Sequence, residues 1–149
     1  MTDLFQPVQL GALTLANRII MAPLTRCRAD ADHVPTAIMA EHYAQRASAG
    51  LIVAEATMVA EGNSAFWREP GIYSEAQIAG WKQVTDAVHA KGGRIFLQIW
   101  HGGRACHPAL NNGAIPVSAS AIAIDDTVHT PEGKLPYATP RTLEDAEIP

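Results

Sequence analysis

A glutamine lies inside a segment that has the pattern of a buried strand. Residues 92–104 are GGRIFLQIWHGGR, so Gln98 stands between three apolar residues and the pair Ile99 and Trp100. Burying an amide without a hydrogen-bond partner costs about 1–3 kcal/mol. We therefore expect the Gln98 amide to have a polar partner.

Other polar side chains fall at or near the ends of predicted strands. They are Thr25, Glu55, Thr57 and His101. Glu55 has the position of an acid catalyst, but we expect a structural ion pair, with an arginine on a neighbouring loop. No histidine or carboxylate lies at metal-ligand spacing from His101, so no metal site is predicted.

The elements that carry these residues alternate between strand and helix. The predicted order is a hairpin around Gly11, a strand over 18–25, a helix from Pro35 to Gly50, a strand over 50–57, a helix from Ser74 to Gly92 and a strand over 94–100. Alternation of this kind is typical of parallel strands joined by right-handed crossovers, in an open doubly wound sheet or in part of a (β/α)8 barrel. The first strand has no glycine-rich phosphate motif after it, and the polar residues gather at strand ends, so a barrel is favoured.

The segment from His101 on is different. It is rich in Gly, Pro, Asn, Ser and Thr and has no sustained period, which predicts a loop of about forty residues that could serve as a lid. At its end, TPRTLEDAEIP predicts the start of a helix, with Thr142 as its cap and Pro149 in its first turn. A chain that stops inside a helix that has just begun is expected to be the product of a cut rather than to end at an evolved terminus.

Composition limits the class of protein. The 149 residues are 48% hydrophobic and 17% charged, which predicts one globular domain. A net charge of −4 gives no reason to expect nucleic acid or an anionic membrane as partner. Cys27 and Cys106 make no disulfide framework, and the start of the chain has no signal-peptide pattern, so a cytoplasmic protein is expected.

Four motifs carry a resemblance to a known family. The segments MAPLTRCRA, QRASAGLIVAEAT, EPGIYSEAQIAGWKQVTDAVHAKGGRIFLQIWHGGR and PVSASAI resemble the Old Yellow Enzyme family of FMN-dependent ene-reductases, in particular its N-ethylmaleimide reductase-like branch. The resemblance runs from Leu4 to Pro149. It implies that residues 1–149 are the N-terminal part of one FMN-binding (β/α)8 TIM barrel, with a bottom-capping hairpin, strands one to three and a long loop, and without strands four to eight.

The resemblance gives Gln98 a partner. It implies that the Gln98 amide bonds the pyrimidine edge of FMN, whose carbonyl oxygens and ring N–H match an amide that both donates and accepts. Thr25 would donate its hydroxyl near flavin O4 and tune the reduction potential. The backbone of Pro23, Leu24 and Ala56 would line the isoalloxazine ring.

The same resemblance implies a substrate pocket formed by Thr25, Phe66 and Trp100. Phe66 stands where relatives often have a tyrosine. Without the family context, a strand-end hydroxyl that bonds the backbone is the favoured interpretation of Thr25, and a core residue that of Trp100. A second branch of the family has a redox-tuning cysteine in place of Thr25, but Cys27 lies two residues later and is expected to be inert. His101 is expected to be a hydrogen-bonded packing residue.

The implied reaction is reduction of FMN by NAD(P)H, followed by reduction of the C=C bond of an enone, maleimide or nitro-compound. In the family, the residues that bind the activating oxygen and donate the proton follow strand four, so this chain is expected to hold no catalytic residue. One hypothesis is that a second polypeptide supplies the C-terminal barrel part. The alternative is a non-catalytic, truncated half-barrel that self-associates to cover its open edges.

Overall fold

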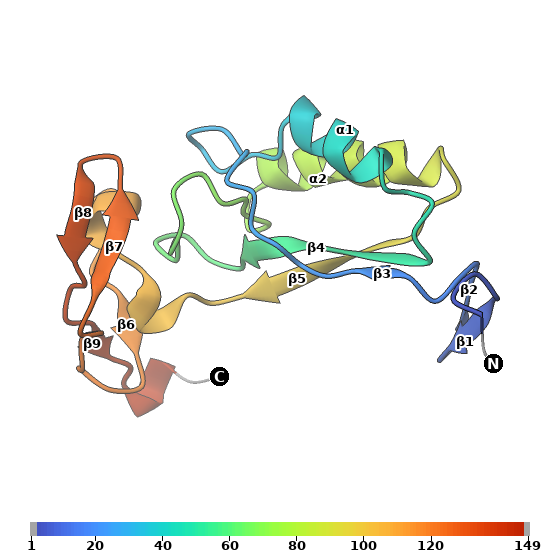
Figure 1. Cartoon of the computed structure of the whole chain (residues 1–149). Coiled ribbons are helices and arrows are strands. Elements are labelled where there is room, and N and C mark those ends of the chain that lie inside the picture. The colour runs from blue at the N-terminus through green and yellow to red at the C-terminus, as the bar shows by residue number, and fades with distance from the viewer. Residues whose placement is uncertain (1–2, 148–149) are drawn as a thin grey trace.

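A parallel sheet with two helices on one face forms the centre of the molecule (Figure 1). The computed structural model describes residues 3–147. The sheet has the order β3 (Ile20–Met21), β4 (Leu51–Met58), β5 (Ile95–Trp100), and the crossovers hold α1 (Ala37–Ala44) and α2 (Glu75–His89). The predicted strand–helix alternation is therefore confirmed, and residues 3–147 do not form a closed barrel.

The first strand is shorter than predicted. Only Ile20 and Met21 pair with β4, and the chain runs on to Thr25 outside the ladder. Pro23 has no N–H to donate to a neighbouring strand, which explains why pairing ends before it. The expected hairpin is confirmed as β1 (Val8–Leu10) and β2 (Leu13–Leu15), which pair antiparallel.

The core lies between the sheet and the helices. It is built mainly from Met39, Tyr43, Ile52, Ala54, Trp81, Val84 and Val88. Helix α2 begins with the predicted capping box: Ser74 Oγ accepts the Gln77 N–H at 3.3 Å, and Gln77 Oε1 accepts the Ser74 N–H at 3.2 Å. Before β4, the chain passes so close to Asn17 that a Cβ at Gly50 would collide with the Asn17 carbonyl oxygen.

The other face of the sheet is uncovered by the described residues. Side chains alternate along β5, so Ile95 and Leu97 pack toward the helices while Phe96 and Gln98 are exposed. Ile20 of β3 is exposed as well. The prediction that the strand of Gln98 is buried is therefore wrong for this chain.

The segment after β5 has more regular structure than predicted. It contains short 3-10 turns at Gly103–Ala105 and Pro108–Leu110, a hairpin of β7 (Thr127–Thr130) and β8 (Gly133–Pro136), and a parallel pair of β6 (Val117–Ser118) and β9 (Arg141–Thr142). These elements gather at one end of the molecule (Figure 1).

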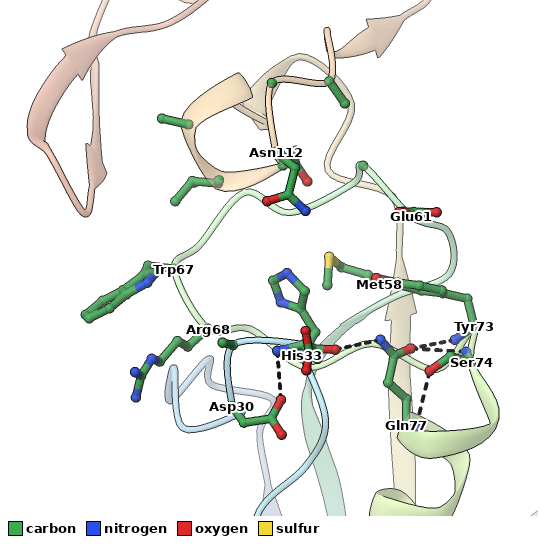
Figure 2. A pocket seen from close by; sticks show the side chains of 18 of the residues that line it. Asp30, His33, Met58, Glu61, Trp67, Arg68, Tyr73, Ser74, Gln77 and Asn112 are labelled. Carbon is green, nitrogen blue, oxygen red and sulfur yellow. Dashed lines mark hydrogen bonds between the residues drawn. The ribbon is translucent and has the colours of Figure 1, made fainter.

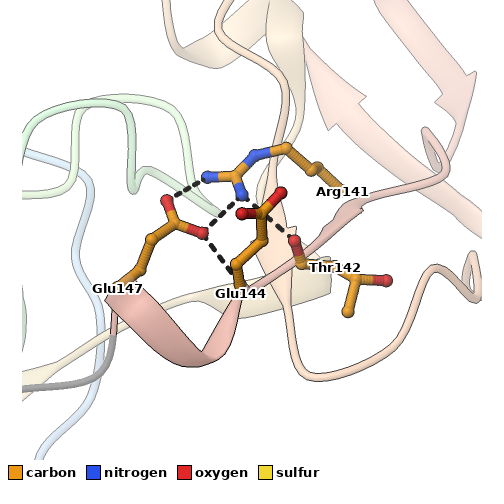
Figure 3. A network of polar contacts seen from close by, with 4 residues as sticks. All are labelled: Arg141, Thr142, Glu144 and Glu147. Carbon is orange, nitrogen blue, oxygen red and sulfur yellow. Dashed lines mark hydrogen bonds and ion pairs between the residues drawn. The ribbon is translucent and has the colours of Figure 1, made fainter.

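Thr142 lies in β9 and does not cap a helix, which corrects the prediction for this segment. A 3-10 turn follows at Asp145–Glu147, held by a two-pronged ion pair in which Arg141 donates to Glu147 at 2.6 and 2.8 Å (Figure 3). Pro149 lies outside the described residues. None of the described helices is long and apolar enough to cross a bilayer.

Candidate functional site

Parallel register brings two of the predicted site residues to one level of the sheet. Ala56 of β4 pairs with Gln98 of β5. Both lie near the C-terminal ends of their strands, the edge where ligand sites of barrels are found. Thr25 lies four residues beyond Met21, the last paired residue of β3, where the chain has left the ladder.

Glu55 fixes the segment that contains Thr25. Its Oε2 accepts the backbone N–H of Arg26 at 2.9 Å, and its Oε1 accepts the Tyr43 hydroxyl at 2.9 Å. A register shift between Ala54 and Ala56 marks an irregularity at Glu55, which explains how its side chain meets Tyr43 of α1. Burial raises the pKa of Glu55, and these two hydrogen bonds act against the rise.

The predicted partner of Glu55 is therefore corrected. The Arg26 side chain is exposed, and within residues 3–147 the structure has no ion pair between its guanidinium and Glu55. The backbone amide of Arg26 makes the contact instead, because it stays in the interior while the long side chain remains in water.

Gln98 offers its amide to the open side of the sheet. The side chain is exposed, and its amide forms no hydrogen bond with another described residue. Ala56 beside it is buried and small, so a flat ring could approach the sheet at this level. A free donor and acceptor next to a small residue fit the edge of a flavin ring. The expectation that a buried amide needs a hydrogen-bond partner, in contrast, does not apply to Gln98 in this chain, because its side chain is exposed.

The two aromatic residues predicted to bind substrate are in contact. Phe66, from the loop between β4 and α2, stacks on Trp100 at the end of β5, with ring centroids 5.8 Å apart and planes 14° apart. Trp100 is half-buried, whereas Phe66 is 44% exposed. Their binding role stays a prediction, but the structure places them together at the end of the sheet.

The two remaining predicted residues are His101 and Cys27. His101 Nδ1 accepts the Gly103 N–H at 3.0 Å, but the side chain is exposed, so its expected packing role is wrong for this chain. Cys27 has a left-handed backbone with φ of 54°. Burial raises the pKa of its thiol, so the unreactive protonated form dominates at neutral pH, as an inert residue requires.

Sequence reasoning missed the polar groups beneath the loop 59–74. Glu69 is fully buried there, and Asn111 bonds Ser64 twice, accepting its N–H at 2.7 Å and donating to its carbonyl oxygen at 2.8 Å. The Asn63 side chain donates to the Trp100 carbonyl oxygen at 3.4 Å. These contacts tie the loop that carries Phe66 to the chain after β5. In the sequence, such residues look like those of any polar loop.

A cavity of about 970 Å³ lies beside this loop (Figure 2). It is lined by Asp30, His33, Trp67 and Tyr73 among others, and by none of the residues predicted to bind flavin. Polar side chains that line it bond the neighbouring backbone: Asp30 Oδ1 accepts the Val34 N–H at 2.8 Å, and His33 Nδ1 lies 2.7 Å from the Glu69 carbonyl oxygen. Within residues 3–147, the structure has no cluster of His, Cys, Asp and Glu suited to a metal ion.

Comparison with known proteins links this geometry to flavin enzymes. The model of the NADH:flavin oxidoreductase / NADH oxidase family matches residues 3–148. A probable flavin mononucleotide-dependent alkene reductase of Leishmania infantum is 46% identical, over 97% of this chain and 41% of that protein. The 12-oxophytodienoate reductase 7 of Oryza sativa subsp. japonica is 44% identical, over 98% of this chain and 38% of that protein.

Solved structures agree with the sequence comparison. The old yellow enzyme homologue of Zymomonas mobilis superposes with a TM-score of 0.95 at 51% identity, over 99% of this chain and 41% of that one. Morphinone reductase in complex with tetrahydroNAD gives 0.91 at 48% identity, over 100% of this chain and 43% of that one. The chain spans about two fifths of the length of these relatives. The predicted fold class, the N-terminal part of a (β/α)8 barrel, is confirmed.

Proposed function

Since this chain belongs to the NADH:flavin oxidoreductase / NADH oxidase family, we propose that it forms the flavin-facing strands of an FMN-dependent ene-reductase that uses NAD(P)H. The pairing of Ala56 with Gln98, whose side chain is exposed on the uncovered face of the sheet, carries the proposal. A second polypeptide with the C-terminal barrel part completes the site and supplies the catalytic groups.

Each residue predicted to bind the flavin has a distinct task. Gln98 donates to and accepts from the pyrimidine edge of the ring, and the Thr25 hydroxyl donates near O4. The backbone of Pro23, Leu24 and Ala56 packs along the ring. When bound, FMN supplies hydride transfer from NAD(P)H to an alkene.

Phe66 and Trp100 form a wall of the pocket that holds the substrate, together with Thr25. The stacked pair presents flat apolar surface to an enone, maleimide or nitro-compound. The enzyme works in the cytoplasm, where free thiols such as those of Cys27 and Cys106 stay reduced.

The first experiment is gel filtration of the purified protein with flavin absorbance recorded, followed by denaturing mass spectrometry of each peak. A yellow peak that contains this chain and a second polypeptide, active with NADPH and 2-cyclohexenone, is the expected result. A colourless peak that contains this chain alone would contradict the proposal and leave the self-associating half-barrel.

Gln98→Leu tests the proposed contact with the ring. The substitution keeps the size of the side chain and removes its donor and acceptor, so FMN should dissociate about tenfold more readily in the complete assembly. Gln83→Leu is the matched control, because Gln83 is an exposed glutamine of α2 on the other side of the sheet. Equal FMN affinity of the two variants would show that Gln98 does not bind the ring.

A further inference from the structure

We infer that Glu69 is a positioning residue that holds the Phe66–Trp100 pair in place and thereby sets which substrates the pocket accepts. This inference rests on the proposed function, because it takes the pair as a wall of the substrate pocket. Glu69 itself is fully buried, so it acts through the pair rather than by contact with substrate.

Glu69 contacts the loop that carries Phe66. Its Oε2 accepts the Phe66 backbone N–H at 3.2 Å, and the Glu69 N–H donates to the Phe66 carbonyl oxygen at 3.2 Å. His33 lies 2.7 Å from the Glu69 carbonyl oxygen through Nδ1. The position of the Phe66 backbone is therefore coupled to the Glu69 carboxyl group.

Trp100 presents a buried donor and Glu69 a buried acceptor that are both without a partner. Neither the indole Nε1 of Trp100 nor Oε1, the second oxygen of the Glu69 carboxyl group, has a hydrogen bond within the described part of the chain. The Trp100 side chain also favours the ionised form of Glu69 and so acts to lower its pKa. Leaving a buried donor and a buried acceptor unpaired costs free energy, so a hydrogen bond between these two atoms is favoured.

The Glu69 carboxylate thus has one oxygen for a hydrogen bond with each member of the stacked pair. Ionised, it offers one acceptor oxygen to Phe66 and one to Trp100. An amide of the same size offers one oxygen only, and its NH₂ group must face one of the two donors. Glu69→Gln therefore displaces Phe66 or Trp100 without changing the volume of the interior.

Ionisable groups on several elements surround Glu69. Glu55 lies on β4, Cys27 follows β3, Cys106 follows β5, and His33 precedes α1. Burial raises the pKa of Glu69 to about 8, and the charge of Glu55 adds to the rise. As pH rises through about 8, Glu69 ionises, and its hydrogen bond with the Trp100 indole N–H is therefore expected to strengthen.

The test compares two substrates in the flavin-loaded assembly. At about pH 9, where Glu69 is ionised, Glu69→Gln should raise KM about fivefold for N-phenylmaleimide, whose second ring reaches farther over the stack, and change KM less than about twofold for 2-cyclohexenone. Glu61→Gln is the matched control, an exposed carboxyl in the same loop. Glu69→Asp keeps two acceptor oxygens and should restore part of the selectivity. An unchanged ratio of the two KM values would overturn the inference.

A double-mutant cycle separates positioning from a general loss of structure. Trp100→Phe keeps an aromatic ring and removes the N–H, so Glu69→Gln should have a smaller effect in that background. Equal effects in both backgrounds would mean that Glu69 does not act through Trp100.

An NMR readout needs neither flavin nor activity. With ¹⁵N-labelled tryptophan, the indole N–H signal of Trp100, identified by its loss in Trp100→Phe, should shift with a midpoint near pH 8, and Glu69→Gln should abolish the shift. A signal that does not respond to Glu69→Gln would refute the contact. An assembly that shows the titration but neither binds FMN nor reduces alkenes would instead refute the proposed function.

Discussion

Two buried carboxyl groups support the loops of the candidate site, and their surroundings differ. Glu55 is 1% exposed and receives hydrogen bonds from the Arg26 N–H and the Tyr43 hydroxyl. Glu69 is 0% exposed and has one oxygen without a formed hydrogen bond. Burial raises the pKa of both groups, and for Glu69 the value reaches about 8. Burial is the largest cause for both groups, and the negative charge of Glu55 adds to the rise at Glu69.

This difference predicts how stability depends on pH. Folded Glu69 keeps its proton up to about pH 8, whereas an unfolded glutamate releases it at about pH 4.3. The folded state binds more protons between these values, so Glu69 contributes most to stability below about pH 4. We expect that contribution to fall by up to about 1.4 kcal/mol per pH unit and to be lost above about pH 8.

Urea unfolding at several pH values checks this prediction. Glu69→Gln stays neutral, so its free energy of unfolding should rise relative to the original chain between pH 5 and 8. Both proteins keep Glu55, so their difference reports Glu69 alone. Parallel curves for the two proteins would contradict the assignment. Glu61→Gln, an exposed site in the same loop, should give such parallel curves.

Sequence could predict some of these residues and not others. The pairing of Ala56 with Gln98 follows from parallel strand order, because neighbouring strands bring their ends to one edge. The stack of Phe66 on Trp100 joins residues far apart in sequence, and only the family resemblance suggested a shared pocket. Glu69 gave no signal, since a carboxylate between Arg68 and Pro70 has the pattern of a solvated loop.

At the scale of elements, helix α2 depends on its first turn. The capping box of Ser74 and Gln77 satisfies N–H groups that have no partner inside the helix. Ser74→Ala should therefore lower the free energy of unfolding by about 1 kcal/mol. Ser48→Ala is the control, because Ser48 is exposed and outside the helices. Urea unfolding followed by circular dichroism measures both, and equal stabilities would mean that the cap contributes nothing.

Elements with a long or clear pattern were predicted best. Strand β4 and helix α2 have continuous or periodic apolar positions, and both lie where expected. The hairpin β7–β8 was missed because its strands are short. Its signal was the turn around Pro131 and Gly133 between apolar positions at Val128 and Leu135. Strand β3 was predicted too long because Pro23 was not weighed against the apolar run.

At the scale of the molecule, the sheet has one covered and one uncovered face. Helices α1 and α2 lie on one face (Figure 1), and Phe96, which is 52% exposed, belongs to the other. Neighbouring apolar groups such as Ile20 are exposed there too. An apolar sheet face needs a covering layer, and in a (β/α)8 barrel that layer is the interior formed with the other strands.

Phe96→Ser tests whether the barrel remainder covers this face. Phe96 is largely exposed in the chain, so its loss should change the free energy of unfolding by no more than about 0.5 kcal/mol. Burying a phenylalanine contributes about 1.5–3 kcal/mol, so binding of the chain to the barrel remainder should weaken at least tenfold, with loss of flavin from the gel-filtration peak. Ile122→Ser is the control, an equally exposed apolar residue in the loop after β6. If both variants bind the remainder equally well, the face is not the site of assembly. If Phe96→Ser instead converts a colourless dimer of this chain into a monomer, the face is covered by a second copy, as the half-barrel alternative requires.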